Sequence, residues 1–66
     1  MNPEVIRLPE VLRRTGVSRS TWLAGCKAGR YPRKLKLSER AVGWLASDIE
    51  HFLAERVAAR DAEQAQ

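Results

Sequence analysis

The 66-residue chain contains one cysteine, Cys26, and one histidine, His51, and its apolar residues form no long run. A single cysteine cannot form an internal disulfide, and these two side chains fall short of the three or four ligands of a zinc site. No segment approaches the roughly 20 apolar residues that cross a bilayer, and the first residues lack the features of a secretory signal. We therefore expect a cytoplasmic protein with no metal, no cofactor and no membrane contact.

The chain also lacks the groups of residues that enzymes use. It has no glycine-rich phosphate loop, no pair of carboxylates set to be buried together and no nucleophile beside a base, so we expect no enzymatic activity. Nine of its hydrophobic residues are alanines, and the core depends on the larger ones. Those expected in the core are Leu8, Val11, Leu12, Val17, Trp22, Leu35, Leu37, Val42, Trp44, Leu45, Ile49, Phe52, Leu53 and Val57.

Acidic residues are scarce in the first two thirds of the chain. Residues 1–46 hold ten Lys or Arg against three Glu, a net charge of +7, whereas residues 47–66 hold two basic and five acidic residues, a net charge of −3. An uneven distribution of this kind is typical of a domain that presents one basic face to a polyanion. We therefore expect double-stranded DNA as the partner of the basic segment.

Two short helical patterns flank a Thr-Gly-Val-Ser turn. Apolar residues at i, i+3 and i+4 predict a first helix that starts near Pro9, and Gly16 ends it. Ser18 is a favourable N-cap for a second helix that runs to about Ala28, because its hydroxyl can accept from a free amide of the first turn. Gly29 is expected to close this second helix.

The second helix has an apolar and a polar side. Trp22, Gly25 and Cys26 share one face, and we expect them to pack inward, with Trp22 in the core rather than stacked on a base. Glycine costs about 1 kcal/mol relative to alanine within a helix, so Gly25 is expected to lie against the first helix or the Trp22 ring. The opposite side carries Arg19, Ser20, Leu23 and Lys27.

After Pro32 the pattern changes from helical to alternating. Residues 34–37 place two lysines and two leucines on opposite faces. In residues 41–44, Val42 and Trp44 are likewise two residues apart and so share one face. This pattern predicts a two-stranded hairpin whose leucines lean on the helices, since a lone hairpin is unstable in water. Lys34 and Lys36 are then expected to point outward.

A third helix is predicted by the capping-box sequence Ser47-Asp48-Ile49-Glu50. Its buried side is expected to consist of Ile49, Phe52, Leu53 and Val57. The order helix, helix, basic hairpin, helix predicts a mainly α, α+β domain of the winged helix-turn-helix class over residues 1–60. Residues 61–66 have nothing large to bury and are expected to form a frayed or disordered tail.

Several stretches resemble the AlpA-like prophage regulators, small relatives of the MerR-like and excisionase winged-helix proteins. They are Ile6–Val11, Thr15–Thr21, Gly29–Pro32, and Arg40–Leu45 followed by Ser47–Ile49 and Phe52–Arg56. The resemblance implies a bacterial, nucleoid-associated transcriptional regulator of phage or mobile-element genes, such as an integrase gene. It equally allows an excisionase-type directionality factor that bends attachment-site DNA. We expect a weakly associating monomer that forms a weak homodimer or a multimer on DNA.

A protein–protein adaptor is the alternative from another class. In that interpretation the acidic third helix binds a partner and the basic side serves only solubility. The apolar residues of that helix are required by the core, which argues against it.

The predicted DNA contacts lie on the two helices of the turn and on the hairpin. Arg19 can grip guanine in a bidentate way or bind a phosphate, and Leu23 can contact a thymine methyl or simply be exposed. The hairpin cations can bind phosphates or merely protect a strand edge from pairing. The predicted contact residues are Arg13, Arg14, Ser18, Arg19, Ser20, Leu23, Lys27, Arg33, Lys34, Lys36 and Arg40.

Overall fold

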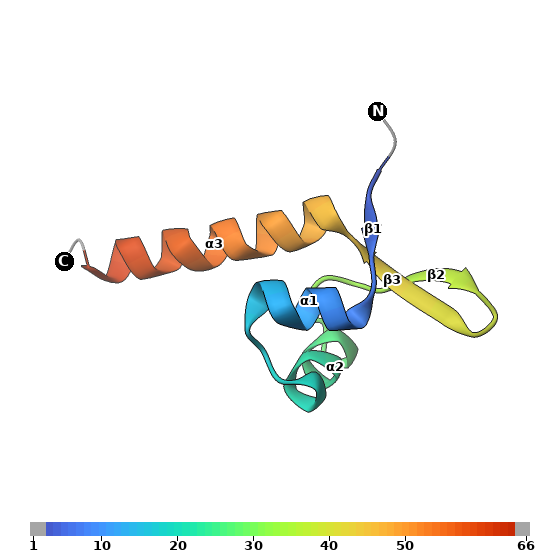
Figure 1. The fold of residues 1–66 in the computed structure, drawn as a ribbon. Coiled ribbons are helices and arrows are strands. Elements are labelled where there is room, and N and C mark those ends of the chain that lie inside the picture. The colour runs from blue at the N-terminus through green and yellow to red at the C-terminus, as the bar shows by residue number, and fades with distance from the viewer. Residues whose placement is uncertain (1–2, 65–66) are drawn as a thin grey trace.

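A computed structural model describes residues 3–64, which form helices on one side of a small antiparallel sheet (Figure 1). The elements are β1 (Val5–Ile6), α1 (Leu8–Thr15), α2 (Arg19–Lys27), β2 (Leu35–Ser38), β3 (Ala41–Leu45) and α3 (Ala46–Gln64). In Figure 1 the β2–β3 hairpin and the end of α3 project to opposite sides, and α2 lies beneath α1. This arrangement confirms the predicted α+β, winged helix-turn-helix class; below, the β2–β3 hairpin with its turn at 39–40 is called the wing.

The turn between α1 and α2 is held by its own side chains. Gly16 ends α1 in the left-handed conformation, with φ of 72°, as predicted. The Thr15 hydroxyl donates to the Val11 carbonyl at 2.9 Å and accepts from the Val17 amide at 3.4 Å. The Ser18 hydroxyl accepts from the Thr21 amide at 3.3 Å, which confirms the predicted N-cap. These bonds fix where α2 starts relative to α1.

The core is built around the side chain of Trp22, which is fully buried. Its ring stacks on Tyr31, with centroids 4.9 Å apart, and meets the edges of Trp44 and Phe52 at 6.1 and 5.6 Å. Ile49 lies in the same buried cluster. The prediction that both tryptophans are core residues is therefore confirmed, whereas the role of Tyr31 was not expected.

Gly25 is buried as predicted, but the prediction of its neighbour was wrong. The Tyr31 ring, rather than α1 or the Trp22 ring, occupies the space beside it, and an ideal Cβ at Gly25 would lie 2.9 Å from Tyr31 Cγ and overlap other ring atoms. Gly29 follows α2 with φ of 82° and turns the chain back, so that Tyr31 comes to lie over Gly25. The glycine therefore lets the aromatic ring close against the helix backbone.

The sheet contains a strand that the alternating pattern did not reveal. β1 pairs with β3, so the strand order is β1-β3-β2, with Ile6 opposite Trp44 and Lys36 opposite Val42. Directly opposed residues of antiparallel strands point to the same face, and successive residues alternate. Lys36 therefore shares the face of the buried Trp44, on which α2 also packs.

The prediction that the wing leucines lean on the helices was wrong. Leu35 pairs with Gly43, on the face opposite Trp44, and a Cβ at Gly43 would meet Val5 and Leu37 on that same face. Leu35 and Leu37 are accordingly 41% and 42% exposed. Leucines and lysines do lie on opposite faces as predicted, but each set lies on the other face from the one expected. A shift of one residue in register is enough to exchange the two faces of a strand.

The third helix starts earlier than expected, and it packs against the rest of the domain over a shorter stretch than expected. It begins at Ala46, whose amide donates to the Glu4 carbonyl at 2.8 Å, so Ser47 lies inside the first turn and the capping-box prediction was wrong. Val57 is 47% exposed and not buried as predicted, because α3 runs past the body. The helix continues through residues 61–64, and residues 65–66 of the expected tail lie outside the described part.

Candidate nucleic-acid interface

The outward side of α2 presents a row of three residues at four-residue spacing. Arg19, Leu23 and Lys27 are all exposed, Ser20 lies beside them, and α2 itself contains no acidic residue. At about 1.5 Å per residue the row spans about 12 Å, close to the width of the DNA major groove, about 12 Å. The inward packing of Trp22 and Gly25 holds this row outward.

The end of this row faces the base of the wing across a hollow of about 540 Å³, here called the α2–wing hollow. Its lining consists of Leu23, Cys26, Lys27, Arg33, Lys34 and Trp44. It thus combines three cations from two separate segments with an apolar floor, and no acidic side chain is among its lining residues. Four of the predicted contact residues, distant in sequence, are brought together here.

Two hydrogen bonds to one carbonyl fix the width of the α2–wing hollow. The Trp44 indole Nε1 donates to the Pro32 carbonyl oxygen at 3.1 Å, and the Cys26 thiol donates to the same oxygen at 3.4 Å. Burial raises the pKa of the Cys26 thiol above its usual 9.0, so the thiol is neutral and acts as a donor. The segment that carries Arg33 and Lys34 is thereby tied to α2 and β3.

The remaining wing cations lie beyond the hollow. Lys36 is exposed and shares the sheet face of Trp44, on the α2 side, and Arg40 is exposed in the turn at the wing tip. The expectation that the lysines point away from the helices was therefore wrong. The actual register places Lys36 on the same side of the sheet as α2, and Lys34, just before β2, lines the α2–wing hollow.

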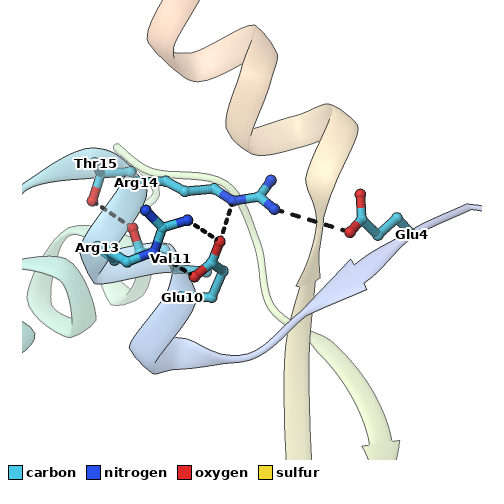
Figure 2. A network of polar contacts seen from close by, with 6 residues as sticks. All are labelled: Glu4, Glu10, Val11, Arg13, Arg14 and Thr15. Carbon is cyan, nitrogen blue, oxygen red and sulfur yellow. Dashed lines mark hydrogen bonds and ion pairs between the residues drawn. The ribbon is translucent and has the colours of Figure 1, made fainter.

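Arg13 and Arg14 have a different environment from the other predicted contacts (Figure 2). Both donate to Glu10: Arg13 through Nε at 2.7 Å and Arg14 through Nε at 2.8 Å. The Arg14 guanidinium also lies 3.9 Å from the Glu4 carboxylate, toward the segment before β1. Hydrogen bonds from Arg13 and then Arg14 lower the pKa of Glu10 to about 2. Their charges are therefore balanced within the protein, a pairing that the i, i+3 and i, i+4 spacing could have revealed.

A second hollow, of about 370 Å³, lies between α3 and the loop before β2. Arg30 and Arg33 face the acidic Asp48 and Glu55 across it, with Pro32, His51 and Phe52 completing the lining. Charges of both signs therefore line it, unlike the α2–wing hollow. Arg33 belongs to both.

Comparison with known proteins assigns the chain to a family. Residues 4–57 match the family described as prophage CP4-57 regulatory protein (AlpA). The chain belongs to the AlpA family. It is 37% identical to the DNA-binding transcriptional activator AlpA of Escherichia coli K12, over 79% of this chain and 83% of that protein. It is also 36% identical to the uncharacterized protein ORF88 of Enterobacteria phage P4, over 83% of this chain and 62% of that protein.

Membership of the AlpA family confirms the resemblance drawn from the sequence. It also agrees with the expectation that the chain is not an enzyme, because the family consists of regulatory proteins. No solved structure matches the chain. Within residues 3–64, no helix is long and apolar enough to cross a membrane.

Proposed function

We propose that this AlpA-family chain is a double-stranded DNA-binding transcriptional regulator of phage or mobile-element genes. The observation that carries the proposal is the exposed row Arg19, Leu23 and Lys27 on α2, which runs without an acidic residue into the α2–wing hollow. The name of the Escherichia coli relative supports the same function. A protruding cationic helix is suited to the major groove, where bases are distinguished.

In this mode α2 enters the major groove with its first turn leading. Arg19 contacts a guanine O6 and N7, and Leu23 lies against a thymine methyl. Ser18 keeps its place as the N-cap, and Ser20 contacts a neighbouring base edge or phosphate. Lys36 and Arg40 bind phosphates beside the groove that α2 enters. Such contacts position the protein but carry little sequence information.

A salt titration of duplex binding tests the proposal. Six cations on this surface have no acidic partner among the recorded ion pairs of residues 3–64: Arg19, Lys27, Arg33, Lys34, Lys36 and Arg40. If these cations together neutralise three to six phosphates, the logarithm of affinity falls with the logarithm of salt concentration at a slope of about −3 to −5. Fluorescence anisotropy with a labelled duplex measures this slope, and a slope near zero would contradict DNA binding by this surface.

The duplex that the chain binds more tightly distinguishes regulation at a promoter from excision at an attachment site. We propose regulation of an integrase-type gene as the role, and a band-shift comparison of promoter and attachment-site duplexes separates it from an excision factor that bends DNA. Tighter binding and stronger bending of the attachment site would favour excision.

From Ala54 to Gln64 every residue of α3 is exposed, which leaves this acidic segment free to contact a partner protein.

A further inference from the structure

We infer that the α2–wing hollow is a subsite for one backbone phosphate of the bound duplex, and that this contact sets how far α2 advances along the groove. The inference rests on the proposed function and deepens it. It assigns Lys27, Arg33 and Lys34 to a single phosphodiester group and makes Leu23, at the edge of the same hollow, the residue whose position that phosphate determines.

The chemistry of the lining suits a phosphodiester. Lys27 approaches from α2, while Arg33 and Lys34 approach from the segment before β2. Arginine and lysine donate charge-assisted hydrogen bonds to phosphate oxygens, and such bonds are stronger beside apolar walls, which exclude water. Trp44 and Leu23 supply these walls, and the apolar sugar edges of a DNA strand can lie against them.

The hollow is preorganised rather than assembled on binding. Trp44 and Cys26 both donate to the Pro32 carbonyl, and Tyr31 is locked between Gly25 and the Trp22 ring. Tyr31 and Pro32, directly before Arg33, are therefore held against α2, and two residues after Arg33 the chain is held by the pairing of Leu35 with Gly43. A phosphate bound there fixes the distance from the DNA backbone to Leu23, because α2 and the segment before β2 cannot move independently of each other.

The second hollow provides an internal comparison. It shares Arg33 and contains Arg30, but Asp48 and Glu55 of α3 line its other side. Two carboxylates beside a bound phosphate would repel it, so an anion is directed to the α2–wing hollow. Arg30→Ala therefore removes one positive charge from a neighbouring position outside the proposed subsite, and it is a matched control for Lys34→Ala.

A methylphosphonate scan tests the assignment directly. Each phosphate of a bound duplex is replaced in turn by a neutral methylphosphonate, and binding is measured for the unaltered chain, Lys34→Ala and Arg30→Ala. We expect one linkage whose neutralisation weakens binding of the unaltered chain and of Arg30→Ala about tenfold, and of Lys34→Ala much less. The same loss in all three proteins at every linkage would overturn the inference while leaving DNA binding intact.

Alkylation of Cys26 by N-ethylmaleimide gives a second readout, because the thiol lines the hollow. A saturating duplex is expected to slow the reaction at least fivefold, whereas sodium chloride at the same ionic strength is expected to leave the rate unchanged. The control is Cys26→Ser with Ala62→Cys on exposed α3, whose alkylation should not respond to DNA. Unchanged Cys26 alkylation in a bound complex, or equal protection by sodium chloride alone, would overturn the subsite; absence of duplex binding would overturn the proposed function as well.

Discussion

Replacing Gly25 with alanine tests whether the Tyr31 ring holds the start of the wing against α2. An added Cβ would overlap the ring, with Tyr31 Cγ only 2.9 Å away. The ring cannot simply turn aside, because it stacks on Trp22 and meets the edge of Phe52 at a centroid distance of 5.2 Å. Overpacking of this kind costs about 1–3 kcal/mol, and the lost aromatic pairs about 0.5–1.5 kcal/mol more.

The higher helix propensity of alanine offsets about 1 kcal/mol of this loss at Gly25. We therefore expect a net destabilisation of about 0.5–3.5 kcal/mol. For a domain of this size each kcal/mol shifts Tm by about 4–8 °C, so thermal unfolding followed by circular dichroism should show a decrease of at least about 2 °C.

The matched control for this change is the same substitution in a Tyr31→Ala background. Once the ring is gone, Gly25→Ala has no atoms to displace, and it should be neutral or should raise Tm. A Gly25→Ala protein more stable than the unaltered chain, or equal losses in both backgrounds, would refute the reasoning that the ring requires the glycine.

Three further outcomes are expected. The Glu10 carboxylate, with a pKa of about 2 against the usual 4.5, stabilises the fold above pH 4.5, and this stabilisation is lost as the pH falls toward 2, so Glu10→Gln should flatten the acid side of a Tm–pH curve. Leu37→Thr should cost less than about 1 kcal/mol in urea unfolding, against about 2–5 for a buried leucine truncation. Arg19→Ala should reduce discrimination between cognate and scrambled duplexes in anisotropy titrations, whereas Lys36→Ala should weaken both equally.

Each of these three has a result that would contradict it. An unchanged acid slope in Glu10→Gln would show that the carboxylate gains nothing from Arg13 and Arg14. A loss above about 2 kcal/mol in Leu37→Thr would show that the leucine is buried in solution. Equal weakening of both duplexes by Arg19→Ala would assign that side chain to a phosphate rather than a base.

Local signals predicted the helix-turn-helix well. The left-handed Gly16, the Ser18 cap and the inward face of Trp22 depend on residues within one or two turns of each other, so the sequence carries the information needed to place them. The same argument placed Arg19, Leu23 and Lys27 on the outside of α2.

The errors arose where distant segments decide the structure. The faces of Leu35 and Lys36 depend on the register with β3, which in turn is covered on its other edge by β1, a two-residue strand too short to show alternation. Likewise, the partner of Gly25 is a ring six residues away that a turn brings back. The α2–wing hollow could not be predicted for the same reason, since hydrogen bonds to the Pro32 carbonyl define it.

The most direct test of the account is chemical-shift mapping of the labelled protein during titration with a duplex. If α2 enters the groove and the wing base binds the backbone, amides of residues 18–27 and 33–36 shift most, and those of residues 54–64 stay in place. Perturbations that cluster on α3 and leave α2 unchanged would contradict the claim that this helix and the wing form the DNA-binding surface.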